Sequence, residues 1–276
     1  MQTGCYTQEV TMDEKAGSIY EFDYTMICEY FASLERQGPG SPEATLRALE
    51  FIEGPAGRPL TESDVPVQAA DIGCGTGGQT MILASHTAAR ITGVDLSPQF
   101  ISLFNKNAAV HNVQDRVHGI TGSMEKLAFG KESLDLIWAE GSIAHIGFER
   151  GITEWRPLLK TGGYIAVTDA TWFTDGRPQE IEVFWNDAYP EIGTTAVKIA
   201  QMQKAGYMPV AAFALPEVCW TDNYFVPAVE ARRLFLKKHA GDKAAAELMR
   251  FQEHEAELYG KYKQYYGYVF YIGRKL

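Results

Sequence analysis

The stretch that decides the fold is Ala69-Ala-Asp-Ile-Gly-Cys-Gly-Thr-Gly-Gly-Gln79. It overlaps the end of a short apolar run at 67–72, which predicts a strand, and it leads into a helix expected over 76–85. Gly73 and Gly75 permit a tight turn and allow a ligand to approach the backbone closely. The first turn of the helix adds unpaired N–H groups and the positive end of the helix dipole. The stretch therefore predicts a strand–turn–helix unit that binds a ligand.

A second stretch, Ile91-Thr-Gly-Val-Asp-Leu-Ser97, predicts what kind of ligand this is. Asp95 ends the next expected strand, 22 residues after Gly73. An acid at that place can accept hydrogen bonds from both hydroxyls of a ribose. Gly73, Gly75 and Gly78 also fit G-x-G-x-x-G, the dinucleotide fingerprint, which by itself is a weak signal. Together the two stretches indicate a nucleoside-containing ligand.

Strands and helices alternate on either side of the turn. The sequence predicts strands at 67–72, 90–96, 117–121, 134–139 and 164–170, with helices at 76–85, 97–110 and 148–159 between them. Strands separated by helices of this length favour a parallel sheet with right-handed crossovers. The fold class expected is a doubly wound, Rossmann-like α/β domain.

The two ends of the chain carry different patterns. An aromatic-rich helix is expected over 18–36, followed by a breaker at 37–41 and by a second helix that Ser41 caps and that runs to about residue 53. Later segments predict helices at 178–189 and 194–205, a strand at 208–215, a helical run over 228–263 and a last strand at 265–273. We therefore expect an N-terminal helical lid over 1–66 and a ligand-binding domain over 67–276, with a helical insertion at about 216–264.

Composition excludes several classes of protein. The 276 residues carry a net charge of −10, which argues against a nucleic-acid partner. The four cysteines are widely spaced, so neither a disulfide framework nor a metal site is expected. Neither an apolar leader at residues 1–10 nor a transmembrane stretch is seen, which predicts a cytoplasmic protein without a membrane partner.

These motifs resemble those of class I S-adenosylmethionine-dependent methyltransferases. Asp71-Ile-Gly-Cys-Gly-Thr-Gly77 is similar to their first motif and Gly93-Val-Asp-Leu-Ser97 to the one that follows. Gly122-Ser-Met124, with Phe129 and Leu134-Asp-Leu-Ile137, resembles the adenine-binding turn and fourth strand. The similarity extends over about residues 67–170 and is nearest in character to the group that includes ubiquinone and menaquinone biosynthesis enzymes and their small-molecule relatives. It implies a seven-stranded sheet whose last strand, here 265–273, runs antiparallel.

The resemblance also implies roles for individual residues, with S-adenosylmethionine as the cofactor. Asp71 and the backbone of Gly73 and Gly75 would hold its methionine part, and Asp95 its ribose. The remaining cofactor contacts implied are Leu96 against the adenine, Ser123 and Met124 at the adenine edge, and Glu140 toward the methionine ammonium or the acceptor.

Methyl transfer from a sulfonium is an in-line displacement, so positioning and exclusion of water carry much of the catalysis. A general base is needed only where the nucleophile must lose a proton early. His145, five residues beyond Glu140, is the candidate base because its pKa lies near neutrality. His145 and Glu140 are thus the candidate catalytic residues, and the acceptor is expected to be a small molecule with an O, N or C nucleophile.

Aromatic side chains predict an acceptor pocket near the strand ends. Those favoured are Tyr24, Tyr30, Trp172 and Phe173, with the last two directly after the fifth strand. Phe184, Trp185 and Tyr189 have a helical spacing that is more typical of a core.

Two alternatives stay open at this point. One is an NAD-dependent oxidoreductase using Gly73–Gly78, against which Asp71 argues, since an acid beside a pyrophosphate is unfavourable. The other is a protein that binds the cofactor without catalysis. A homodimer is also left open.

Overall fold

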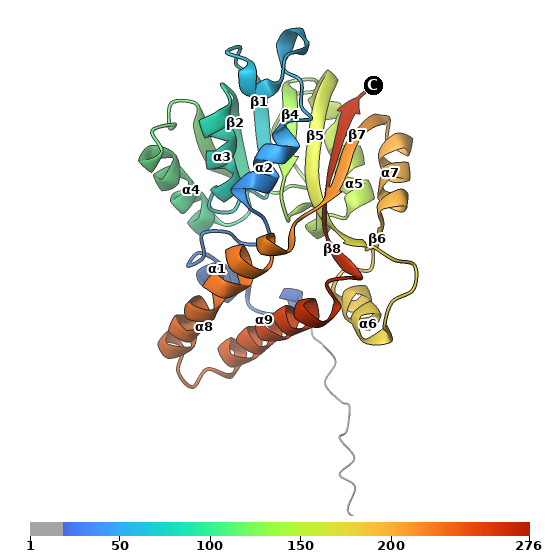
Figure 1. Cartoon of the computed structure of the whole chain (residues 1–276). Coiled ribbons are helices and arrows are strands. Elements are labelled where there is room, and N and C mark those ends of the chain that lie inside the picture. The colour runs from blue at the N-terminus through green and yellow to red at the C-terminus, as the bar shows by residue number, and fades with distance from the viewer. Residues whose placement is uncertain (1–18) are drawn as a thin grey trace, which may run out of the picture.

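The computed structural model describes residues 19–276, and its centre is one mixed β-sheet (Figure 1). The strand order is β3-β2-β1-β4-β5-β8-β7, in which β1 to β5 are parallel and β8 is antiparallel to both of its neighbours. The strands are β1 (Gln68–Ile72), β2 (Arg90–Asp95), β3 (Val117–Thr121), β4 (Leu134–Ala139), β5 (Leu159–Trp172), β7 (Tyr207–Ala214) and β8 (Tyr266–Lys275). The predicted seven-stranded sheet with an antiparallel last strand is confirmed. A two-residue strand, β6 (Gly193–Thr194), which the sequence did not predict, pairs with the end of β5.

Helices cover both faces of the sheet because alternate residues of each strand point to opposite sides. In β4, Leu136 and Trp138 belong to the apolar cluster that contains α2 (Pro42–Leu49), α3 (Gly78–His86) and α4 (Pro98–Val110). Ile137 and Ala139 belong to the cluster on the other face, with α5 (Phe148–Trp155) and α7 (Thr195–Lys204). A strand buried on both sides is typical of a doubly wound fold.

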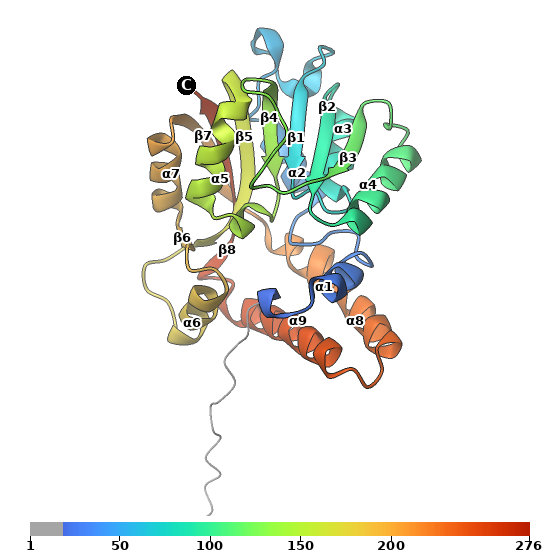
Figure 2. The ribbon, with the colours of Figure 1, turned by 180° about the vertical axis from the view of Figure 1, so that it is seen from behind.

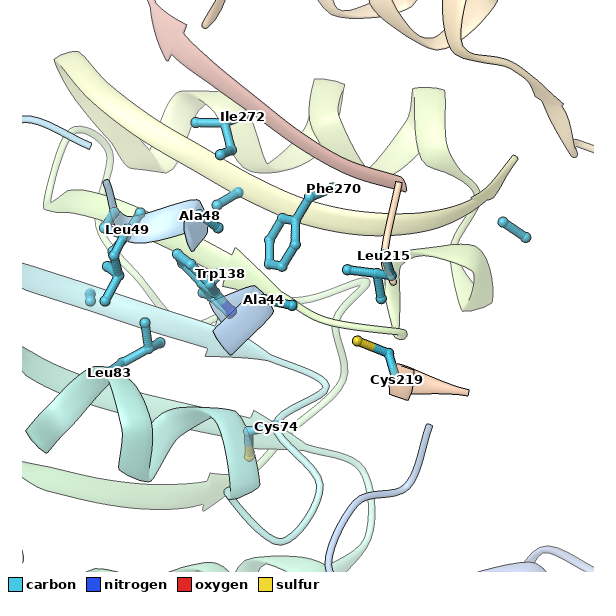
Figure 3. Packing of buried hydrophobic residues seen from close by; sticks show 14 of the residues in the cluster. Ala44, Ala48, Leu49, Cys74, Leu83, Trp138, Leu215, Cys219, Phe270 and Ile272 are labelled. Carbon is cyan, nitrogen blue, oxygen red and sulfur yellow. The ribbon is translucent and has the colours of Figure 1, made fainter. Parts of the chain in front are cut away.

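Packing on the first face is close around Trp138, whose side chain is fully buried. Figure 3 shows Ala44 and Ala48 of α2 beside Trp138, and the ring of Phe270 on β8 packs edge-on against Trp138 with 5.4 Å between ring centres. The small alanine side chains allow α2 to lie directly against the sheet. The same helix carries Thr45, which reaches the functional site described below.

Four further helices form a cap below the carboxyl ends of the parallel strands (Figures 1 and 2). They are α1 (Tyr24–Phe31), α6 (Gln179–Ala188), α8 (Val226–Lys238) and α9 (Lys243–Tyr262). Buried residues of α1, α8 and α9 form a third apolar cluster, which includes Tyr30, Phe235 and Leu248. Helices far apart in the sequence thus enclose the strand ends.

Several expected boundaries were wrong. The helix expected over 18–36 is a 3-10 turn (Ile19–Glu21) followed by α1, and Ser18 lies outside the described residues. The run expected over 228–263 divides into α8 and α9, because Gly241 adopts a positive φ and Asp242 caps a new helix through the N–H groups of Ala244 and Ala245.

The second helix, which Ser41 does cap, ends at Leu49 rather than near residue 53. The helix expected over 148–159 gives way to a 3-10 turn (Arg156–Leu158), so that β5 begins at Leu159. In the part of the chain that the structure describes, no helix is both long and apolar enough to cross a membrane.

Candidate active site

The glycine turn between β1 and α3 is built on three positive φ angles. Gly73, Gly75 and Gly77 have φ of 72°, 54° and 91°, a region that side chains disfavour. The N–H groups of Gly73 and Cys74 both donate to the carbonyl of Val94, at 2.8 and 3.1 Å. This bond pair fixes the turn to the end of β2, where Asp95 follows.

Asp71 lies below this turn and is fully buried. Its Oδ2 accepts hydrogen bonds from Thr80 Oγ1 at 2.5 Å and Gln79 Nε2 at 3.0 Å, while Oδ1 has no hydrogen-bond partner among the described residues. Burial raises the pKa of Asp71 to about 7, and the bond from Thr80 opposes that shift. Asp71 supports the turn from beneath and lies outside the walls of the two cavities described below, so its expected contact with the cofactor stays a prediction.

Asp95 lies on the opposite side of the turn, where it lines the cavities described below. Its Oδ2 accepts from the N–H of Gly75 at 3.0 Å and its Oδ1 from the N–H of Ser97 at 2.9 Å. Burial raises the pKa of Asp95, and these backbone bonds oppose the shift. The neighbouring Leu96 is 58% exposed, large for an apolar side chain, and lines the same space.

A small cavity of about 130 Å³, here named the turn cavity, lies against these residues. Gly73, Gly75 and Asp95 form one side of it, together with Gly141 and His145. Residues 36–39 of the loop between α1 and α2 form the other side. Gly73, Gly75, Asp95, Glu140 and His145 are therefore brought together, as the sequence predicted.

Glu140 lines the turn cavity, but its carboxylate already accepts three hydrogen bonds. Oε2 accepts from Arg36 Nη2 at 2.6 Å, and Oε1 accepts from Thr45 Oγ1 at 2.7 Å and from Trp138 Nε1 at 2.9 Å. A carboxylate offers about four acceptor positions, so about one is left for a ligand. This arrangement argues against Glu140 as a proton-transferring catalytic residue, and it fixes Arg36 at the cavity wall.

Arg36 and Gln37 were missed by the sequence reasoning. Gln37 Oε1 accepts from the N–H of Thr76 at 3.1 Å, and its amide nitrogen donates to the carbonyls of Phe31 and Leu34. The Gln37 side chain thus connects the end of α1 to the glycine turn. The only available signal was the position of Gln37 at the start of the breaker at 37–41, with Arg36 directly before it.

Ser123 and Met124 follow β3 at the same edge of the sheet but lie outside the walls of the turn cavity and of the larger cavity described next. The carbonyl of Met124 accepts from Trp155 Nε1 at 3.0 Å, and the Met124 side chain approaches Gly73. The Ser123 hydroxyl accepts from the N–H of Glu125. The structure places this pair behind the turn, so their adenine contact stays a prediction.

A larger cavity of about 500 Å³, here named the cap cavity, continues from the turn cavity. The two share Gln37, Asp95, Phe100, Gly141 and His145. Its remaining walls come mainly from three helices of the cap, α1, α6 and α9, and are largely apolar. A ligand at the glycine turn would therefore adjoin an enclosed apolar space.

His145 lies where the two cavities meet, at the end of a 3-10 turn (Ile143–His145) after β4. Its side chain is accessible from the cavity, yet protein surrounds it. Burial lowers the pKa of His145 and the charge of Asp95 opposes that shift. A neutral imidazole at this junction can accept a proton, so the placement suits the base role predicted for it.

Of the four aromatic residues predicted for the acceptor pocket, the structure brings only Tyr24 to the cap cavity. Tyr30 is fully buried and packs edge-on against Phe235 in the cap. Trp172 is buried and stacks on Arg177, with the guanidinium 4.2 Å from its ring centre. Phe173 is 41% exposed and lies outside the cavity wall. β5 carries Trp172 and Phe173 past the cavity and Tyr30 packs among the cap helices, so a contact of these three residues with the acceptor stays a prediction.

Phe184, Trp185 and Tyr189 line the cap cavity instead, although their helical spacing indicated a core. All three are buried, so burial and cavity lining coincide here. Tyr189 is held from behind: its hydroxyl donates to Asp169 Oδ2 at 3.2 Å and accepts from Lys198 Nζ at 3.2 Å. Lys198 and Asp169 form a buried ion pair at 2.6 Å.

This arrangement offers a defined chemistry. The glycine turn lets a polar ligand approach the backbone closely and Asp95 presents a carboxylate to it, while the cap provides a largely apolar space beside them. Such a site suits reaction of a polar cofactor with a hydrophobic partner, controlled mainly by position.

Comparison with known proteins identifies a related family for the centre of the chain. Residues 69–163 match the family described as "Methyltransferase domain". The erythromycin 3''-O-methyltransferase of Saccharopolyspora erythraea is 36% identical over 135 residues, which is 47% of this chain and 42% of that protein. This chain therefore aligns with less than half of that relative's length.

Solved structures share the fold over nearly the whole chain. A SAM-dependent methyltransferase from Geobacter sulfurreducens, in complex with S-adenosyl-L-homocysteine, superposes with a TM-score of 0.76 at 19% identity and covers 92% of this chain and 99% of its own. The [4+2]-cyclase SpnF superposes with a TM-score of 0.69 at 19% identity, covering 91% and 93%. At these identities the likeness concerns the fold, and these two proteins illustrate that one fold carries more than one chemistry.

Proposed function

We propose that this chain transfers a methyl group from S-adenosylmethionine to a small, largely apolar acceptor, since residues 69–163 match the methyltransferase-domain family. The observation that carries the proposal is the continuity of the turn cavity with the cap cavity at Asp95, Gly141 and His145. A cofactor at the turn would have its reactive end beside an enclosed space large enough for a small molecule.

The residues at the turn fit the cofactor. Asp95 is placed to accept from ribose hydroxyls, and Leu96 offers an exposed apolar side chain to the adenine. Bound S-adenosylmethionine supplies a methyl group activated by a sulfonium. Arg36 lines the turn cavity and has one carboxylate partner, Glu140, so its remaining N–H donors suit the carboxylate of the methionine part.

The cap would supply orientation and dryness. Tyr24, Phe31, Trp185 and Tyr189 surround the acceptor space with rigid rings, which keeps water away from the reacting atoms. His145 would accept a proton only where the acceptor's nucleophile carries one that must leave. The segment of α1 and the loop after it would act as a lid, since Gln37 joins that loop to the turn.

A second candidate has a specific observation in its favour. Because SpnF shares this fold and is named a cyclase, a protein with this fold can catalyse a reaction other than methyl transfer. The second candidate is therefore that the turn binds the cofactor while the cap cavity binds the substrate of a different reaction.

The test is calorimetric titration of the purified chain with S-adenosylhomocysteine, with NADH in parallel and Asp95→Ala as the variant. We expect binding of S-adenosylhomocysteine in the micromolar range, on the order of −8 kcal/mol, that the variant loses. Binding of NADH instead, or of neither ligand, would contradict the proposal. Binding without transfer of a labelled methyl group to any member of an acceptor library would favour the cyclase-like alternative.

A further inference from the structure

The cap wall of the cap cavity carries one acidic side chain, Glu255 of α9. It lines the cavity together with Gln252, which lies one turn earlier on the same helix. Neither residue was singled out by sequence reasoning, because both stand in a charged helical run that is typical of an exposed surface.

Glu255 has no ion-pair or hydrogen-bond partner among the described residues, although the other acids near the site are all engaged. No lysine or arginine is found among the described residues that line the cap cavity. The surrounding side chains are mainly aromatic and include Trp185, Tyr224 and Phe251. An unpaired carboxylate in such surroundings is costly unless a cation or a proton compensates it.

Position separates Glu255 from the cofactor. Glu255 stands on the cap helix α9, whereas Asp95, Gly141 and His145 come from the ends of β2 and β4 on the sheet side. Figures 1 and 2 show α9 below the strand ends. Residues of α9 and of the strand ends line the cap cavity together. The carboxylate therefore addresses the molecule that fills the cap cavity.

We infer that the cap cavity binds a hydrophobic amine, with Glu255 pairing with its protonated nitrogen and the aromatic side chains around it. This inference rests on the proposed function, because it names the class of acceptor for that site. A carboxylate with aromatic faces close by is the combination that recognises organic cations.

Burial raises the pKa of Glu255 to about 7, which agrees with this reading. Without a partner the carboxyl tends to keep its proton near neutrality, and an incoming cation would favour the ionised form. Pairing with a cation would thus complete the ionisation of a carboxyl that is about half protonated at pH 7 when unpaired.

The experiment compares two probes of equal size, 4-phenylbutylamine and 4-phenylbutan-1-ol. Binding of each to the full chain is measured by calorimetry, with and without saturating S-adenosylhomocysteine. We expect the amine to bind at least about tenfold more tightly than the alcohol. Glu255→Gln should remove that preference, while Glu257→Gln, an exposed acid on the same helix, should preserve it.

Equal affinity for the two probes in the wild-type chain, including absence of binding by both, would overturn the inference. So would an unchanged preference in Glu255→Gln. Because the wild-type comparison does not depend on any variant, a folding defect in Glu255→Gln cannot hide a negative result. A chain that discriminates the amine without binding S-adenosylhomocysteine would uphold the inference about the cavity and refute the proposed function alone.

Discussion

The two walls of the site are built by different means. The sheet wall comes from residues 73–96 and 140–145, which two βα junctions of a regular sheet place by backbone geometry. The cap wall comes mainly from α1, α6 and α9, which are far apart in the sequence, and it is defined by side chains. The cofactor side of the site is therefore set by the fold, whereas the acceptor side is set by the side chains of this particular sequence.

Each wall also contains a buried carboxyl, and the two are stabilised differently. Asp71, under the turn, has only hydrogen bonds from Thr80 and Gln79. Asp169, behind the cap residue Tyr189, has the cation Lys198 at 2.6 Å. Asp71 is thus stabilised as a protonated acid under the turn. The position of Tyr189 in the cap wall instead depends on the ion pair between Asp169 of β5 and Lys198 of α7.

The largest expected effect breaks that ion pair. Lys198→Met leaves the Asp169 carboxyl buried without its cation, which should lower the free energy of unfolding by about 3–5 kcal/mol. Urea unfolding followed by circular dichroism measures this. The matched control is Lys204→Met, since Lys204 stands on the same helix in a solvent-exposed pair and should leave the midpoint unchanged. Equal midpoints for both variants would show that the pair does not stabilise the cap.

The next effect concerns Asp71 and pH. Folded Asp71 keeps its proton to about pH 7, while the unfolded chain loses it near the ordinary value of 3.8. Between these values the folded state binds more protons, so stability falls as pH rises, by up to about 1.4 kcal/mol per pH unit. Glu255, whose pKa is also raised to about 7, contributes in the same direction.

Asp71→Asn should therefore reduce this slope by about half while keeping an acceptor for Thr80. Urea midpoints measured from about pH 5 to about pH 7 give the slope for both proteins. An identical slope in the variant would mean that Asp71 is ionised throughout.

A third prediction tests the dependence of the sheet wall on backbone geometry. In Gly75→Val, a branched side chain would occupy a positive φ of 54° and collide with the Gln37 carboxamide. We expect affinity for S-adenosylhomocysteine to fall by at least about 100-fold, with amine binding in the cap cavity little changed. Gly176→Ala is the control, because nothing lies within 4 Å of that position. Comparable cofactor affinity in both variants would contradict the assignment of the turn.

The smallest effect separates the two ends of the cofactor. Arg36→Met should weaken S-adenosylhomocysteine by about tenfold and leave adenosine, which has no carboxylate, unaffected. Calorimetry with both ligands gives the comparison. If both ligands weaken equally, Arg36 acts by ordering the loop and does not contact the carboxylate.

The sheet wall could be predicted from sequence because its signals are local. Gly73, Gly75 and Asp95 occupy strand ends and turns whose geometry is set within a few residues, and the strands at 117–121 and 134–139 were predicted to the residue. The antiparallel last strand, which the family resemblance implied, is also confirmed.

The cap wall could not be predicted because its residues meet only after the fold forms. Glu255 and Gln252 face the cavity since α9 crosses below the sheet, and nothing in their own segment indicates that. Trp172 and Phe173 were favoured from their position after the fifth strand, but β5 continues past the cavity and Trp172 packs against Tyr266 of β8. Trp185 and Tyr189 line the cap cavity where Trp172 and Phe173 were expected.

A crystal structure with S-adenosylhomocysteine would test whether the glycine turn and the cap cavity form one site. If they do, the ribose will lie at Asp95, the carboxylate at Arg36, and the sulfur will be directed between Gly141 and His145 into the cap cavity. A ligand bound elsewhere, or one whose sulfur is directed away from the residues of the cap, would contradict it.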